Sequence, residues 1–203
     1  MRIAIVDYGM GNISSIVSAL RYIGVDDIII SNNPEELAGA DKLILPGVGN
    51  YANAAKKVVN LNLKEILHKL VVVEKKPILG ICLGMQILGL SSTESGFNQG
   101  LGFVDGCVDK FEGCNLKIPH VGYNQVSPNQ SSRLYDGLSN SPDFYFTHSF
   151  KMMSESDIGE SMTCYGNSFI ASFEVGNIAG VQFHPELSQT NGLKLLQNFV
   201  ERF

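Results

Sequence analysis

Short apolar runs alternate with segments of helical periodicity through the first half of the chain, and this alternation restricts the fold more than any other feature. Met1 to Val6 is rich in Ile, Val and Ala, and a glycine turn separates it from apolar residues at helical spacing between Ile13 and Ile23. The strand pattern returns at Ile28 to Ile30 and at Leu43 to Leu45, and a short helix is expected to begin near Asn33. Such alternation predicts an open, mainly parallel sheet with helices on both faces.

The pattern changes near Gly102. Before it, Tyr51 to Val73 is expected to be helical, and Pro77 to Ile81 is expected to form a buried strand that leads into another helix. After it, short strand-like pieces between turn residues predict a mixed or antiparallel β extension. These pieces are Phe103 to Val108, Phe144 to Thr147, Phe169 to Phe173 and Ile178 to Phe183, and a last amphipathic helix is expected from Gly192 to Phe203. Without a repeat or a linker, residues 1–203 are expected to form a single α/β domain.

Charge and hydropathy exclude several classes of protein. The net charge is −5 and the 15 basic residues are spread along the chain, so we expect no nucleic-acid partner. The apolar run from Ile3 to Val6 is too short for a signal peptide, and Pro77 to Leu90 falls short of the ~18 residues that cross a bilayer. We therefore expect a cytoplasmic protein with no membrane association.

Cysteine and glycine spacing gives no sign of a metal or a cofactor. The four cysteines include no C-x-x-C pair, so reduced thiols are expected rather than disulfides. Cys114 and His120 have no second pair at ligand spacing, which argues against zinc. Gly9 to Ser14 follows the first strand, but Ser14 replaces the third glycine of a dinucleotide-binding loop and no acidic residue ends the second strand. We expect neither metal nor cofactor.

The sharpest local candidate for chemistry is Cys82, where a buried strand meets a helix. Gly80 and Gly84 flank it as in the nucleophile elbow of hydrolases, whose strained backbone requires small neighbours. The N-terminus of the following helix favours a thiolate, and the Leu83 N–H is suited to binding an oxyanion. Gln86 lies one helical turn further on the same face, where it would contact either substrate or solvent. The alternative is that Cys82 is a small buried apolar residue.

Two further segments follow predicted strands and complete a possible site. His184 and Glu186 lie two residues apart on extended backbone, so their side chains point the same way and the carboxylate could hold the imidazole. The alternative for this pair is a capped strand end with a solvated Glu. Leu45 to Gly49 offers backbone N–H groups between glycines for an oxyanion hole, or it is an ordinary strand-to-helix turn. Open α/β sheets place their sites at the carboxyl ends of strands, where all three segments lie.

Five motifs occur in a fixed order along the chain: P-G-V-G from Pro46, G-I-C-L-G-M-Q from Gly80, P-H-V-G-Y-N from Pro119, Y-F-T-H-S-F from Tyr145 and H-P-E from His184. Together they resemble the class I (triad) glutamine amidotransferases. Their order and spacing are most similar to the glutaminase subunits of imidazole glycerol phosphate synthase, the HisH type. The resemblance runs from Met1 to Phe203 and implies a flavodoxin-like α/β fold.

The resemblance implies residue roles and a reaction. L-glutamine would be hydrolysed by Cys82 as nucleophile and by His184, which Glu186 orients. The oxyanion hole would use the backbone of Gly47 or Val48 together with Leu83. The glutamine-binding positions of the family correspond to Gly49, Gln86, Glu94, His148, Ser149 and Phe150.

The resemblance also implies a partner, because ammonia released into water at neutral pH becomes the non-nucleophilic ammonium ion. The family partner is a (β/α)₈ cyclase subunit of the HisF type, in a heterodimer that makes imidazole glycerol phosphate and an aminoimidazole carboxamide ribotide for histidine biosynthesis. Tyr123, Asn124 and Leu187 correspond to partner-facing positions. Tyr123 replaces the usual Trp of P-H-M-G-W-N, and Leu187 replaces a basic residue after H-P-E, which hints at an altered partner.

Three alternatives stay open at the level of sequence. A paralogue with the same triad would supply ammonia, through a cyclase-like partner, for the amidation of a surface-glycan sugar. A free-standing cysteine hydrolase or peptidase would be active without any partner. A docking or regulatory subunit with a relic site would keep its function after Cys82→Ser.

Overall fold

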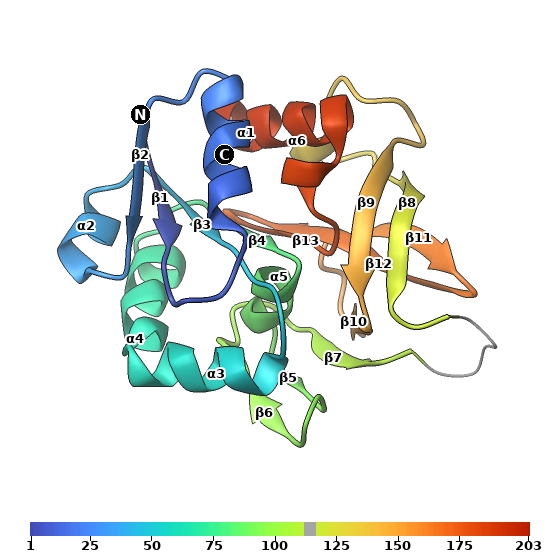
Figure 1. Cartoon of the computed structure of the whole chain (residues 1–203), viewed down its shortest axis with the longest axis horizontal. Helices are drawn as coiled ribbons and strands as arrows, with labels where there is room; N and C mark the ends of the chain where they lie inside the picture. The colour runs from blue at the N-terminus through green and yellow to red at the C-terminus, as the bar shows by residue number, and fades with distance from the viewer. Residues whose placement is uncertain (112–116) are drawn as a thin grey trace.

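A computed structural model describes residues 1–111 and 117–203 of the chain (Figure 1). Its main sheet has nine strands, of which the first five in spatial order pair in parallel and the others pair antiparallel. This confirms the predicted parallel sheet with an antiparallel extension. In spatial order the strands are β2 (Asp27–Ser31), β1 (Arg2–Val6), β3 (Lys42–Leu45), β4 (Ile78–Ile81), β13 (Ile178–Val181), β12 (Asn167–Val175), β11 (Ser161–Tyr165), β8 (His120–Ser127) and β9 (Asp143–His148).

Helices cover both faces of the parallel strands, as Figure 1 shows. Side chains alternate along β1, so Ile3 and Ile5 pack in one hydrophobic cluster while Ala4 and Val6 pack in another. The first cluster includes apolar residues of α1 (Ile13–Tyr22) and α6 (Gln189–Arg202). The second cluster lies under α2 (Pro34–Ala38), α3 (Tyr51–Asn60), α4 (Leu63–Leu67) and α5 (Leu83–Leu88). In the described part of the chain, no helix is both long and apolar enough to span a bilayer.

The helical conformation predicted from Tyr51 to Val73 is confirmed except at Leu61 and Asn62, where the structure divides the segment. α3 ends at Asn60, α4 begins at Leu63, and a π-helical turn, η1 (His68–Val73), follows directly. Asn62 has a φ of 53°, in the left-handed region that short polar side chains tolerate better than most. Residues Leu61 and Asn62 therefore turn the chain where the hydrophobic periodicity alone suggested continuity.

A second, smaller sheet lies beside the main one and has the order β10 (Phe150–Met153), β7 (Cys107–Lys110), β5 (Ser91–Ser92) and β6 (Asn98–Gln99). The strand predicted from Phe103 to Val108 is therefore shifted, because only its last two residues belong to β7. Strand β8 was not predicted as a strand. Its burial alternates along most of its length and Gly122 interrupts it, so it has no apolar run to signal it.

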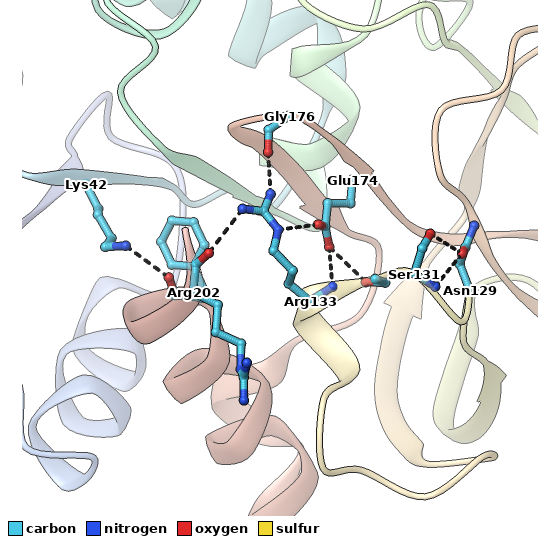
Figure 2. A network of polar contacts seen from close by, with 9 residues as sticks. Lys42, Asn129, Ser131, Arg133, Glu174, Gly176 and Arg202 are labelled. Atoms are coloured by element: carbon cyan, nitrogen blue, oxygen red, sulfur yellow. Dashed lines mark hydrogen bonds and ion pairs between the residues drawn. The ribbon is translucent and has the colours of Figure 1, made fainter.

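The C-terminal turn of α6 is held by cations from other elements (Figure 2). Arg133, in the 3-10 helix η2 (Arg133–Tyr135), donates from Nε to Glu174 Oε1 at 2.6 Å and from Nη1 to the carbonyl of Arg202 at 3.1 Å. Its guanidinium also lies 3.7 Å from the ring centroid of Phe203. Positive groups at a helix C-terminus satisfy carbonyls that lack intrahelical partners. This network fixes α6 against the antiparallel half of the main sheet.

Candidate active site

Cys82 lies at a sharp turn between β4 and α5, and its backbone is strained. Its φ of 52° and ψ of −110° place a non-glycine residue in a sparsely populated region, which the surrounding packing must maintain. A Cβ on Gly84 would lie 1.9 Å from the Leu45 carbonyl oxygen, and one on Gly80 would lie 2.7 Å from the Met85 nitrogen. Both flanking glycines are therefore required by close backbone approach, as expected for a nucleophile elbow.

His184 and Glu186 form a buried pair beside this turn. The Nδ1 of His184 lies 2.8 Å from Oε1 of Glu186, and the two side chains are 3% and 1% exposed. The other ring nitrogen, Nε2, is buried, has no hydrogen-bond partner among the described residues, and faces Cys82. Burial by itself lowers the pKa of His184, but its contacts with Cys82 and Glu186 outweigh burial and raise this pKa to about 10. The raised pKa favours an imidazolium beside the sulfur of Cys82.

The backbone of His184 is fixed by its neighbours, and its ring is held by the contact with Glu186. Its N–H donates to the carbonyl of Tyr145 in β9 at 2.9 Å. The next turn is η3 (Pro185–Leu187), and Ser188 Oγ donates back to the His184 carbonyl at 2.5 Å. Ser188 Oγ also accepts from the Tyr145 N–H at 2.9 Å. Strand β9 and η3 thus jointly fix the position of the His184 backbone.

The predicted oxyanion-hole groups meet, but they bond to one another. The Leu83 N–H donates to the carbonyl of Gly47 at 3.3 Å, so in this conformation the donor is already used. Gly47 must be glycine, because a Cβ there would lie 2.5 Å from the Gly84 nitrogen. Tyr8 is buried, and its hydroxyl donates to the Pro46 carbonyl at 2.7 Å, which fixes the chain immediately before Gly47.

A cavity of about 300 Å³ opens above Cys82. It is lined by all six residues predicted to bind glutamine, namely Gly49, Gln86, Glu94, His148, Ser149 and Phe150. Cys82, Leu83, His184 and Val48 complete the wall, together with Pro119 and Thr147, which had no predicted role. Glu186 lies behind His184, outside this lining. Of the predicted oxyanion set, Gly47 is also absent from the wall, since its carbonyl turns to Leu83.

Two of the lining residues have their polar atoms partly committed to the protein. The Nε2 of Gln86 donates to the Phe150 carbonyl at 3.1 Å and to Gln182 Oε1 at 2.9 Å, and the residue is buried. Glu94 Oε2 accepts from the Tyr51 N–H at 2.7 Å, where it caps the start of α3. The remaining oxygen of each side chain is the one that a ligand would meet.

His148 differs from the prediction in a specific way, because its ring nitrogens are occupied. Nδ1 lies 2.8 Å from the Phe150 carbonyl oxygen, and Nε2 lies 3.0 Å from Nδ1 of His120. Burial lowers the pKa of His148 to about 3 and that of His120 to about 4, so both rings are neutral. His148 therefore shapes the cavity wall, and its ring nitrogens are not free to bind a ligand.

The three residues predicted to face a partner do not share one surface. The Tyr123 hydroxyl donates to the Leu187 carbonyl at 2.8 Å, and both side chains are exposed. Asn124 follows Tyr123 in β8, so its side chain points to the opposite face of the strand and donates to the Cys164 carbonyl at 2.8 Å. The structure brings Tyr123 and Leu187 together and separates Asn124 from them.

Sequence reasoning missed Gln182, which is fully buried and donates from Nε2 to Cys82 Sγ at 3.6 Å. One signal could have found it, because it is the only polar residue in the apolar run from Ile178 to Phe183 and stands two residues before His184. Among residues 1–111 and 117–203, no group of three or more His, Cys, Asp or Glu side chains is placed to hold a metal. Cys114, considered above as a ligand, lies outside the described residues.

The comparisons with known proteins agree with this geometry. The family model of glutamine amidotransferase class-I matches residues 4–203. Imidazole glycerol phosphate synthase subunit HisH 1 of Campylobacter jejuni (strain RM1221) is 46% identical over 199 residues, covering 98% of each chain. Subunit HisH of Aquifex aeolicus is 41% identical over 204 residues, covering 100% of this chain and 97% of its own. PurLQS from Thermotoga maritima shares the fold, with a TM-score of 0.71, 19% identity and coverage of 98% and 97%. With a strained cysteine elbow, a buried His–Glu pair and a family match over nearly its whole length, this chain belongs to the class I glutamine amidotransferases.

Proposed function

We propose that Cys82, His184 and Glu186 hydrolyse the side-chain amide of L-glutamine. The Cys82 thiolate attacks the amide carbon, and the His184 imidazolium gives its Nε2 proton to the departing nitrogen, so that ammonia leaves and a glutamyl thioester remains. His184, now neutral, takes a proton from water, which attacks the thioester and releases glutamate and the thiolate. Glu186 holds Nδ1 protonated throughout and stabilises the imidazolium. The buried 2.8 Å contact between His184 and Glu186 beside the strained Cys82 is the observation that carries this proposal.

The cavity supports glutamine as the substrate. Its volume of about 300 Å³ suits a small amino acid, and its polar groups lie on the walls around the thiol. The free oxygens of Gln86 and Glu94 would accept from the α-ammonium group, and the backbone from Ser149 to Phe150 would meet the α-carboxylate. Gly49 lies at the same wall, so substrate backbone atoms could approach closely there.

An oxyanion hole in this enzyme requires a change of backbone conformation. The Leu83 N–H is bonded to the Gly47 carbonyl, so we infer that the peptide between Gly47 and Val48 rotates to replace this carbonyl with the Val48 N–H. The Tyr8 hydroxyl holds the preceding carbonyl of Pro46, which confines the movement to this peptide. A subunit in this state is slow alone, which fits an enzyme that acts with a partner.

The ammonia is proposed to pass to a synthase subunit. The relatives at 41–46% identity are named as subunits of imidazole glycerol phosphate synthase, so we propose the same role here, in histidine biosynthesis. The partner is then a (β/α)₈ cyclase subunit in a heterodimer, and it combines ammonia with a phosphoribulosyl precursor. The three cysteines of the described part are free thiols, which supports a reducing compartment such as the cytoplasm.

One observation favours a second acceptor. Leu187 is 40% exposed and Tyr123 is 46% exposed, and the two residues are joined by a hydrogen bond. Neither side chain is charged, although the resemblance places a basic residue at position 187. A cyclase-like partner with an apolar contact surface would fit this pair, and it would deliver ammonia for the amidation of a surface-glycan sugar. The cysteine chemistry is identical in both cases.

Glutamate formation should be measured for the chain alone, with its co-purified partner, and with partner plus acceptor precursor. We expect the partner plus precursor to stimulate glutamate formation strongly in the wild type and not at all in Cys82→Ala. Complementation of a histidine-requiring strain by the chain with its native partner then separates the two acceptors. Growth supports histidine biosynthesis, whereas failure alongside a stimulated glutaminase supports the second acceptor. Wild-type turnover by Cys82→Ala in the complex would contradict the proposed chemistry altogether.

A further inference from the structure

A buried amide, that of Gln182, lies beside the nucleophile and takes no part in the proton transfers of the triad. Gln182 directly follows β13, is fully buried, and its backbone N–H donates to the Ala171 carbonyl at 2.8 Å. Its Nε2 lies 3.6 Å from Cys82 Sγ, within the range of an N–H to sulfur hydrogen bond. An amide in a buried apolar strand costs free energy unless its polar atoms are paired, so these contacts explain how it is tolerated.

The direction of this amide follows from a chain of hydrogen bonds that begins at a backbone carbonyl. The Phe150 carbonyl only accepts, so the atom of Gln86 that lies 3.1 Å from it must be the NH₂ group. The same NH₂ group lies 2.9 Å from the side chain of Gln182, which must therefore present its oxygen. The NH₂ group of Gln182 is then left to face the sulfur.

The reverse orientation is unfavourable at both ends. If the Gln182 amide turned over, its NH₂ group would face the NH₂ group of Gln86, and its oxygen would face the anionic sulfur of Cys82. His148 reinforces the starting point of the chain, because it donates to the same Phe150 carbonyl at 2.8 Å. The donor at the sulfur is thus set in place before any substrate arrives.

We propose that Gln182 is a further catalytic residue, which donates a hydrogen bond to the Cys82 thiolate and directs it into the cavity. This inference rests on the proposed glutaminase function. The thiolate then has donors on two sides, the imidazolium of His184 and the neutral amide of Gln182. When His184 has given its proton to ammonia, the amide remains to stabilise the sulfur as it leaves the thioester.

The other titratable groups around this sulfur come from several elements. His184 and, behind it, Glu186 follow β13, while Tyr8 follows β1 and has its pKa raised by burial and by the nearby Cys82. His148 in β9 and Glu94 after β5 lie on the cavity wall. None of these is altered when Gln182 is replaced by an apolar side chain, so a change in the thiolate population can be assigned to the amide.

The test is the pH profile of alkylation of the full chain by iodoacetamide, with each cysteine followed separately by mass spectrometry. Gln182→Met keeps the side-chain length and removes the donor, so we expect the midpoint for Cys82 to rise by about one pH unit. At a pH below both midpoints, this equals a roughly tenfold loss of thiolate. Asn198→Met is the matched control, because Asn198 is a fully buried amide that donates to the carbonyls of Leu134 and Asp136, away from the cavity.

The outcomes separate this inference from the proposed function. The inference is supported if the alkylation midpoint of Cys82 rises in Gln182→Met and stays unchanged in Asn198→Met. An unchanged midpoint in Gln182→Met overturns it. If wild-type Cys82 titrates like the exposed Cys107 and Cys164, the proposed ion pair fails and the inference fails with it. Should Gln182→Met not fold, Gln86→Met frees the Gln182 amide to turn. A smaller rise in the midpoint of that variant supports the inference, and no rise contradicts it.

Discussion

Acid should destabilise this protein through a pair of neutral histidines. His120 and His148 are both buried, with their facing nitrogens 3.0 Å apart. The Phe150 carbonyl fixes the proton of His148 on Nδ1, so its Nε2 accepts from His120 Nδ1–H, and Nε2 of His120 accepts from Asn124 at 3.4 Å. Protonation of His148 would place two N–H groups against each other, and the folded state therefore excludes the charged form.

The sign and size of the effect follow from the difference between folded and unfolded pKa values. Both pKa values are lowered by burial from 6.5, to about 4 for His120 and about 3 for His148, so the unfolded chain binds these protons first. The stabilisation that this neutral pair provides is present above pH 6.5 and is lost as the pH falls toward the pKa values of the folded state. Between about pH 6 and pH 5, each histidine should lower the free energy of unfolding by about 1 kcal/mol, so the pair should lower it by about 2 kcal/mol. His184 has a raised pKa, so it is protonated in the folded chain and mostly protonated in the unfolded chain over this range, and it contributes little slope.

Urea unfolding at a series of pH values measures this slope, and His120→Gln tests its origin. Glutamine can still donate to His148 but does not titrate, so the loss between about pH 6 and pH 5 should fall by about half. His68→Gln, at an exposed histidine in η1, is the matched control and should keep the wild-type slope. If His120→Gln kept the full slope, His120 would not be neutral in the folded protein, and the hydrogen-bond assignment would be wrong.

Three further changes test the elbow, the triad and the α6 network. Glu186→Gln should lower partner-stimulated kcat roughly a thousandfold and should also lower the thermal midpoint, because an amide does not stabilise the buried imidazolium. Activity within tenfold of wild type would contradict this role. Gly84→Ala should unfold at a much lower temperature, because its Cβ would clash with a backbone carbonyl at 1.9 Å, whereas Gly39→Ala, with 3.4 Å to its nearest neighbour, should behave as wild type. Equal thermal midpoints for Gly84→Ala and Gly39→Ala would refute the packing argument. Arg133→Met should cost about 1–3 kcal/mol in urea unfolding, since Glu174 and the end of α6 lose their cation, and an unchanged free energy would show the network to be unimportant.

The parallel half of the fold was predictable because its signals are local. Each strand there is a short apolar run, and the turn after β4 requires the glycines that flank Cys82, so pattern and packing agree. The break at Asn62 was not predictable, because residues on both sides continue to favour helix and only the tertiary fold selects the left-handed turn. Strand β8 was not predicted because a strand with polar side chains on one face has no continuous apolar run.

Within the site, the sequence identified which residues gather but not which atoms pair. Cys82, His184 and Gln86 were found because each follows or continues a recognisable strand or helix. The pairing of His148 with His120, and the chain from Phe150 to Gln182, depend on contacts between strands far apart in sequence, so no local pattern encodes them. The same holds for the Leu83 N–H, which any motif reading assigns to the substrate.

The pleat of β8 sends two neighbouring residues of one sequence motif to opposite faces of the strand. Tyr123 and Asn124 are neighbours in sequence, yet one bonds to Leu187 on the exposed surface and the other contacts His120 in the interior. A substitution at Tyr123 therefore changes the exposed surface, whereas one at Asn124 removes the donor from the buried histidine pair. Because His148 of this pair forms part of the cavity wall, Asn124 affects the glutamine site from the side opposite the exposed Tyr123 and Leu187. The exposed pair also reaches the site, because the Leu187 N–H donates to the His184 carbonyl at 3.1 Å. Tyr123 and Asn124 thus connect to the site through different residues, Tyr123 through Leu187 and His184, and Asn124 through the histidine pair.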